Sequence, residues 1–157
     1  MNKFHYRDWL QILGQFGVVA SLLFVGLQIK QDHEIAQSVA YQERSTVAAE
    51  FYWSIASDEV ARSAMSKIFN GETELTAEET DAALWFWRSG KELLQNSYYQ
   101  YQNGYLDDEH WDQIRRLIKR NFEHPMTRSV LLDGNSRPSF QEILIEIEAE
   151  MKAESSK

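Results

Sequence analysis

One uncharged apolar stretch near the N-terminus constrains this chain more than any other feature of its sequence. Residues 9–29, WLQILGQFGVVASLLFVGLQI, lie between Asp8 and Lys30 and contain no charged side chain. An α-helix of that length is about 31 Å long, which matches the hydrocarbon thickness of a bilayer. Trp9 lies at one end, where aromatic side chains favour the membrane–water interface. The stretch therefore predicts a transmembrane helix over residues 9–29.

Two other interpretations of this stretch stay open. A secretory signal peptide would use Lys3 and Arg7 as its basic region, but no small-residue cleavage pattern follows Leu27. A buried helix of a soluble protein is suggested by the three glutamines Gln11, Gln15 and Gln28. Length and hydropathy favour the spanning helix, so we expect a single-pass protein of a cell inner membrane, with the lipid bilayer as its first partner. A small excess of basic residues before the span slightly favours a helical domain outside the cytoplasm.

Polar and small side chains within the predicted span recur at helical spacing. An amide in hydrocarbon needs a hydrogen-bonding partner, and small residues let a second helix approach closely. Glutamines that reach the headgroups are the alternative, which suits Gln11 and Gln28 but not the deeper Gln15. We expect an interface with another transmembrane helix, in a homodimer or a larger membrane complex. This span stripe consists of Gln11, Gly14, Gln15, Gly17, Val18, Ser21, Val25 and Gln28.

The rest of the chain predicts helices and no strand of useful length, so the expected fold class is all-α. Residues 1–8 are interpreted as an N-terminal tail, residues 30–45 as a helical stalk that continues the span, residues 46–152 as a small helical bundle and residues 153–157 as a frayed tail. Capping boxes at residues 76–79 and 139–142, together with Asp58 and Asp107 as caps, mark helix starts. We expect helices near 58–69, 76–103, 108–123 and 139–152, with one further turn around 130–132.

Three stretches, taken in order along the chain, carry a resemblance to other proteins. They are Trp9-Leu10-Gln11; residues 21–31, SLLFVGLQIKQ, with Ala40-Tyr41-Gln42; and residues 98–109, YYQYQNGYLDDE, with Trp111. Together they resemble a widespread group of small bacterial membrane proteins of unknown function. The resemblance implies a single-pass helical membrane protein, and it supplies no catalytic residue to transfer.

Composition and motifs argue against several function classes. The chain has no cysteine and a net charge of -8, which excludes disulfides and thiolate zinc sites and argues against nucleic acid as a partner. His33-Glu34 begins a zinc-protease motif, but Gln37 occupies the second ligand position. Asp107 and His110 have the spacing of a carboxylate–histidine pair, but the other ligands of a di-iron bundle are missing. We therefore expect no metal, no cofactor and no catalytic constellation.

Charged residues on the last two long helices are interpreted as solvated faces. Arg115, Arg116, Lys119 and Arg120 recur at helical spacing, and Glu109 and Asp112 precede them at distances that allow ion pairs within one helix. The acidic residues from Glu142 to Glu154 are expected to face solvent on the final helix.

Aromatic side chains on the helix predicted over 76–103 form the remaining candidate site. Tyr98 and Tyr99 point about 100° apart on a helix, so they cannot both face one core. A tyrosine-rich core with hydroxyl groups at its edge is the simpler interpretation. The alternative is a partner surface formed by Trp85, Tyr98, Tyr99, Tyr101 and Tyr105. Two functional hypotheses follow: a non-catalytic, membrane-anchored interaction module or accessory subunit, and a small-ligand-binding protein or enzyme that uses the aromatic cluster and His110.

Overall fold

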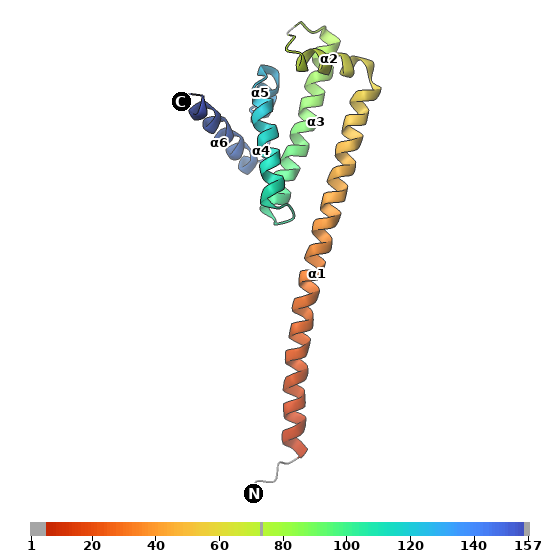
Figure 1. Cartoon of the computed structure of the whole chain (residues 1–157), viewed down its shortest axis with the longest axis vertical. Helices are drawn as coiled ribbons and strands as arrows, with labels where there is room; N and C mark the ends of the chain where they lie inside the picture. Colours follow the sequence, from red (N-terminus) through yellow and green to blue (C-terminus); the bar gives the residue numbers. More distant parts are fainter. Residues whose placement is uncertain (1–5, 73, 156–157) are drawn as a thin grey trace. The chain divides into compact units, whose positions relative to one another are not determined.

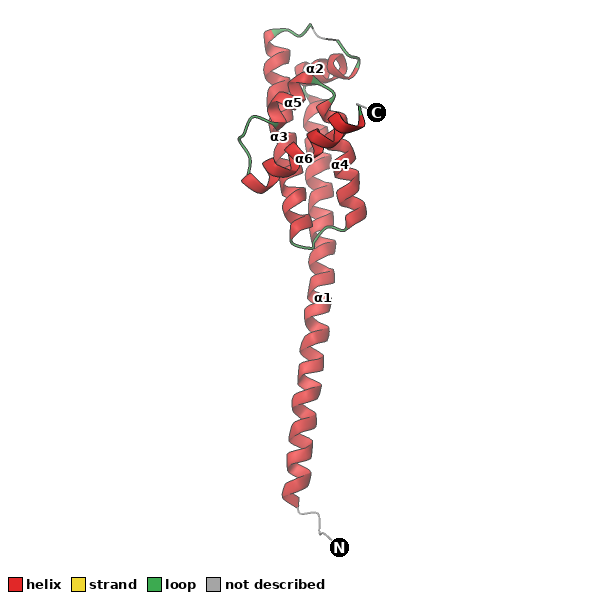
Figure 2. Ribbon diagram, turned by 90° about the vertical axis from the view of Figure 1, so that its left-hand side faces the viewer, coloured by secondary structure: helices red, strands yellow, loops and turns green. Residues whose placement is uncertain are grey.

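The computed structural model describes residues 6–72 and 74–155, without the side chains of residues 7 and 8, and it places only helices in these ranges (Figures 1 and 2). The helices are α1 (Tyr6–Ser57), α2 (Glu59–Phe69), α3 (Ala77–Gln102), α4 (Asp108–Phe122), α5 (Pro125–Leu131) and α6 (Pro138–Glu154). The chain divides into two compact units, Met1–Val39 and Ala40–Lys157. The expected all-α class, a long N-terminal apolar helix followed by a helical bundle, is confirmed.

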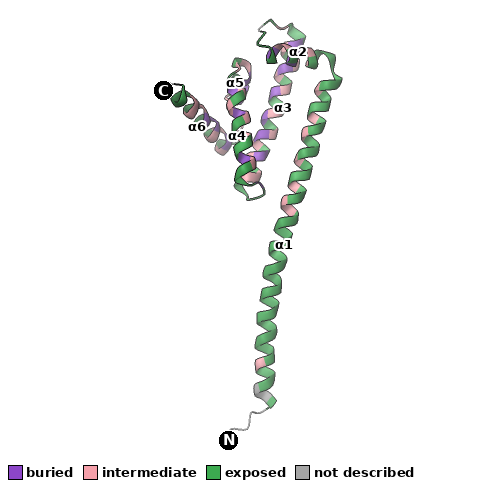
Figure 3. Cartoon of the chain, in the orientation of Figure 1, coloured by how far each residue is buried: buried purple, intermediate pink, exposed green. Residues whose placement is uncertain are grey.

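Between Trp9 and Ile29, every apolar side chain of α1 is exposed except that of Ile12, which is intermediate, and the ribbon of Figure 3 is mostly green there. The most apolar window of this helix has a mean hydropathy of 2.0, and none of the window is buried. Among the described residues, α1 is the one helix long and apolar enough to cross a membrane. A signal sequence passes the same test of length and composition. Most of the predicted tail, including Lys3, lies outside the described residues, and α1 already begins at Tyr6.

Side-chain caps fix the starts of α2, α3 and α4 where the sequence predicts them. The Asp58 and Asp107 carboxylates accept hydrogen bonds of 2.8 Å from the backbone N–H groups of Ala61 and His110. Thr76 and Glu79 form both hydrogen bonds of a capping box. Each cap satisfies a backbone donor that the first turn of a helix leaves without a partner.

The predicted capping box at residues 139–142 is wrong. Helix α6 begins one residue earlier, at Pro138, and Arg137 is its N-cap without a side-chain hydrogen bond. Proline fixes φ near its helical value and lacks the N–H that a cap would satisfy, so it opens a helix without a capping side chain. Pro125 acts in the same way and opens α5, which is longer than the single turn expected near 130–132. Helix α6 also continues to Glu154, into the segment expected to be frayed.

Two groups of buried apolar side chains hold the second unit together. The larger one joins α3, α4, α5 and α6 through Leu94, Trp111, Ile118, Phe122, Leu131, Phe140, Leu144 and Ile147. The smaller one joins α2, α3 and α5 through Ala64, Met65, Ile68, Ala83, Trp87 and Val130. Fully burying one large apolar side chain stabilises a fold by roughly 1.5–3 kcal/mol. The bundle therefore has a core that spans all of its helices from α2 to α6.

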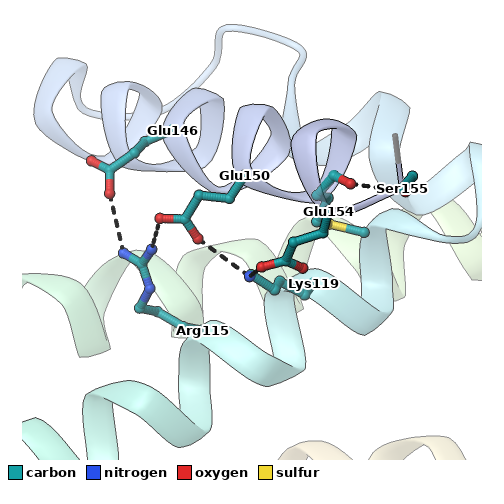
Figure 4. Close-up of polar contacts among 7 residues, drawn as sticks. Arg115, Lys119, Glu146, Glu150, Glu154 and Ser155 are labelled. Carbon is teal, nitrogen blue, oxygen red and sulfur yellow. Dashed lines mark hydrogen bonds and ion pairs between the residues drawn. The ribbon is translucent and has the colours of Figure 1, made fainter. Parts of the chain in front are cut away.

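The charged faces of α4 and α6 pair with each other, which corrects the expectation of pairs within one helix (Figure 4). Arg115 contacts Glu146 at 3.5 Å and Glu150 at 2.6 Å. Lys119 contacts Glu150 at 3.3 Å and Glu154 at 2.9 Å. Sequence spacing alone cannot distinguish a neighbour on the same helix from a neighbour on the helix packed against it.

Candidate ligand cavity

The second unit contains a half-open cavity of about 390 Å³ that residues from α1, α2, α3, α4 and α5 line. This volume lies within the range of roughly 300–1,000 Å³ that is typical of small-molecule sites. The α1 residues of its wall lie between Tyr41 and Tyr52, beyond the apolar stretch that predicts the span. The apolar wall consists of Ala48, Phe51, Phe69, Phe86, Trp87, Leu93, Leu94, Ile114, Leu117 and Leu131.

Ring contacts position α1 against the bundle at two places along the cavity. Phe51 stacks on Phe86 with ring centroids 4.7 Å apart, and Phe86 meets Trp87 edge-on, also at 4.7 Å. Tyr41 meets His110 edge-on at 5.5 Å. Tyr41 and Phe51 are separated by about 15 Å along a helix, at 1.5 Å per residue. Aromatic pairs of this geometry contribute about 0.5–1.5 kcal/mol each beyond area burial, so both contacts help to hold the α1 side of the cavity wall in place.

Three hydrogen-bonding atoms in the cavity wall are buried and have no partner in the described part of the chain. They are Nε1 of Trp87, Oγ1 of Thr127 and Nη1 of Arg44. The Trp87 and Thr127 side chains are only 8% and 1% exposed, so bulk water does not reach them. A buried polar group without a partner costs about 1–3 kcal/mol, and most such groups in proteins are satisfied. Three residues that line the cavity therefore each carry a buried polar atom whose partner the described residues do not supply.

The charged residues of the wall are all basic. Arg44, Lys91 and Arg120 line the cavity together with His110, and no aspartate or glutamate does. The buried Lys91 ammonium donates to Oδ1 of Asp133 at 2.6 Å and to the Val130 carbonyl at 3.2 Å, so its charge is already balanced. Arg44 and Arg120 make no ion pair within the described residues. The cavity therefore presents positive charge without an opposing carboxylate in its wall.

Burial perturbs the Arg44 guanidinium directly. Burial lowers its pKa, while interactions with Tyr41 and Asp107 act in the opposite direction. The Asp107 carboxylate is occupied by His110, whose backbone N–H and ring both hydrogen-bond to it and lower its pKa. An arginine stays charged in a protein despite such a shift. Arg44 is thus a partly buried cation whose nearest carboxylate is engaged elsewhere.

A second depression, about 560 Å³ in volume, lies between α5 and α6 and has different chemistry. Its wall includes Arg128 and Glu148, which form an ion pair with each other. None of the buried polar atoms without a partner belongs to its lining residues. Within the described residues, this depression therefore has no buried polar atom without a partner, and the cavity beside α1 is the stronger candidate site.

The aromatic residues proposed as a partner surface divide into two groups. Tyr98 and Tyr101 pack against Trp111, each with ring centroids 5.2 Å from it, and belong to the edge of the core. Arg88 and Arg137 lie over the rings of two of the others, Trp85 and Tyr99, at 5.3 and 5.0 Å. The exposed group is Trp85, Tyr99 and Tyr105. None of the five lines the cavity.

All residues of the span stripe are exposed, and the structure describes nothing that covers them. A Cβ atom added at Gly14 or at Gly17 would meet no heavy atom within 4 Å. The Ser21 hydroxyl donates to the Gly17 carbonyl at 2.8 Å, so this hydroxyl is satisfied inside its own helix and needs no second helix. No hydrogen bond of the Gln15 amide occurs within the described residues.

Of the cavity residues, sequence reasoning considered His110 and the aromatic run that contains Phe86 and Trp87, but it missed the basic residues Arg44 and Lys91, although one signal was present. Lys91 follows Trp87 by four residues and precedes Leu94 by three, so it places a charge on the buried stripe of α3. A cation in such a position needs a buried partner or a functional reason. Arg44 carries no such signal, because it lies in a mostly polar stretch that predicts a solvated stalk. In the structure, however, the second compact unit begins at Ala40 and includes Arg44.

The chemistry of the cavity rests on these lining residues alone. Aromatic walls, unpartnered donors and uncompensated positive charge suit a small molecule with an apolar body and an acceptor group. In the described part of the chain, no three His, Asp or Glu side chains gather to hold a metal ion. No protein family, curated protein or solved structure matches this chain.

Proposed function

We propose that this chain is a membrane-anchored binding protein whose helical unit holds a small molecule in the cavity beside α1. The observation that carries the proposal is a half-open cavity of about 390 Å³ lined by aromatic side chains and by basic side chains without a carboxylate. The apolar stretch of α1 supplies the anchor, and its continuation from Ala40 to Ser57 supplies one wall of the site.

The anchor is tested by fractionation of cells that produce the full-length chain. We expect the protein to stay in the membrane pellet after an alkaline carbonate wash and to be released by detergent. Recovery in the soluble fraction would contradict the anchor. Intact mass of the recovered protein separates a retained helix from a cleaved signal peptide, because cleavage after the apolar stretch would remove about thirty residues.

Ligand binding is tested with a neutral aromatic probe, naphthalenemethanol. Equilibrium dialysis measures its binding to the full-length protein in nanodiscs of zwitterionic lipid, with empty nanodiscs as the blank. Ala48 lines the cavity, so Ala48→Phe places a ring inside it and should abolish binding.

The matched control for this experiment is the neighbouring alanine. Ala49 lies on the same helix, is exposed and does not line the cavity, so Ala49→Phe should bind like the unmodified protein. Equal thermal unfolding of the two variants, followed by circular dichroism, shows that both fold. Equal binding to both variants would overturn the cavity as the site.

A second candidate function, association through the span, is favoured by one observation. Gln15 lies six residues inside the predicted span and makes no hydrogen bond among the described residues. An amide in that position gains from a polar group on another helix, by about 0.6–2 kcal/mol per hydrogen bond. This accessory-subunit function is compatible with ligand binding, because the two sites use different residues.

A further inference from the structure

We propose that the ligand of the cavity is a small monoanion, a carboxylate attached to an apolar body of about the size of an aromatic bicycle. This inference rests on the proposed function and specifies the chemistry of the same site. It follows from the sign of the charged side chains in the wall, from the number of these cations that lack an ion-pair partner, and from the volume of the cavity.

Charge complementarity selects an anion. The wall contains Arg44, Lys91 and Arg120 and no carboxylate, although the chain as a whole has a net charge of -8. None of the 24 acidic residues of the chain is among the described residues that line this cavity, so the local charge of the wall is opposite in sign to the net charge of the chain. An anion would therefore enter a site whose charged lining side chains are all basic.

The count of unpaired cations selects a single negative charge. The ammonium of Lys91 is balanced by Asp133 at 2.6 Å. Arg120 is an exposed residue of the cavity wall, so water solvates its charge. Arg44 is the remaining cation, half-buried, with Nη1 fully buried and without a partner. One carboxylate fits one guanidinium with two parallel hydrogen bonds and balances its charge.

The aromatic part of the cavity wall determines the size and shape of the apolar body of the ligand. Phe51, Phe86 and Trp87 form a continuous chain of ring contacts, and Phe69 meets Trp87 edge-on at 6.5 Å. These faces suit a flat or short aliphatic body. A volume of about 390 Å³ excludes a whole two-chain phospholipid and accepts a molecule of one or two rings.

The test compares three probes that share one naphthalene body and differ only in charge: naphthoate, naphthalenemethanol and naphthylmethylammonium. Dialysis against the full-length protein in zwitterionic nanodiscs measures all three, with empty nanodiscs as the blank. We expect naphthoate to bind about tenfold more tightly than the alcohol, because a hydrogen bond to a charged group is worth more than a neutral one. The ammonium should bind more weakly than the alcohol.

A pair of variants then assigns the preference to one residue. Arg44→Gln should reduce naphthoate affinity to that of the alcohol, and a cooperative thermal unfolding transition, followed by circular dichroism, shows that the variant is folded. Arg116→Gln is the control, because Arg116 is exposed on α4 and does not line the cavity. It should keep the preference for naphthoate.

The outcomes separate this inference from the function on which it rests. Equal binding of naphthoate and the alcohol would overturn the anion preference and leave the binding function intact. Tighter binding of the ammonium would also overturn it. If none of the three probes binds above the blank, the proposed binding function fails and the inference fails with it.

Discussion

Lys91 and Asp133 form the most deeply buried ion pair among the described residues, and the two partners differ in exposure. The Lys91 side chain is 3% exposed, whereas that of Asp133 is 33% exposed. The Asp133 carboxylate also accepts a hydrogen bond of 2.8 Å from the Asn135 backbone N–H. Removal of either partner breaks the same contact but leaves behind a group in a different environment. We therefore expect the two truncations to cost different free energies of unfolding.

Lys91→Met keeps the apolar stem of the side chain and removes the ammonium. The Asp133 carboxylate then regains water, and the Val130 carbonyl loses the donor at 3.2 Å. The expected loss is about 1–3 kcal/mol, the cost of one buried acceptor without a partner. Asp133→Ala instead leaves a buried ammonium with a single backbone acceptor. The expected loss is about 3–5 kcal/mol, typical of an uncompensated buried charge.

Urea titration of the full-length protein in nanodiscs measures both losses, with linear extrapolation to zero denaturant. Tryptophan emission reports on the helical unit, since four of the five tryptophans lie in Ala40–Lys157. Lys119→Met is the control, because Lys119 is more exposed and its pairs with α6 should contribute only about 0–1 kcal/mol. The reasoning is refuted if Lys91→Met costs as much as Asp133→Ala, or if both cost no more than the control.

Three further predictions concern the core, the α2–α3 junction and the span. Trp111→Ala should lower the free energy of unfolding by about 3–5 kcal/mol in the same titration, because Trp111 is 4% exposed; a loss under about 1 kcal/mol would contradict its burial. The pKa of Glu79 is lowered from 4.5 to about 2, first by the hydrogen bond from Lys67 and then by those from Thr76 and Ser63. The ionised Glu79 carboxylate therefore stabilises the fold above pH 4.5, and this stabilisation is lost as the pH falls towards 2. The difference in Tm between Glu79→Gln and the unmodified protein should shrink as the pH falls through that range, and a difference that does not change with pH would contradict this role of Glu79. Gly14→Leu should weaken cross-linking between copies or to a co-purifying helix, whereas Leu23→Ala should not; equal cross-linking of both would exclude the span stripe as an interface.

The sequence alone predicted the features that depend on neighbours in the chain. The uncharged stretch 9–29 predicted an apolar helix, and the side chains of Asp58, Thr76 and Asp107 predicted three helix starts. A cap acts on backbone groups two or three residues away, so its signal is local. The same reasoning failed at Ser139, because Pro138 satisfies the requirements of a helix start without any side-chain hydrogen bond. The interface expected along the span stripe, the orientation of the span and the resemblance stay predictions.

Contacts between distant parts of the chain required the tertiary structure. Arg115 pairs with Glu146 and Glu150 because α6 packs beside α4, although Asp112 is closer in the sequence. Arg44 lies in a segment that sequence pattern alone assigned to a solvated stalk, and it becomes part of a cavity wall only when α1 packs near α3 and α4. Periodicity reports which face of a helix is apolar, but it does not report which other helix covers that face or how closely. A cavity is the volume that packing leaves unfilled, so the positions of all its walls determine it and no single segment encodes it.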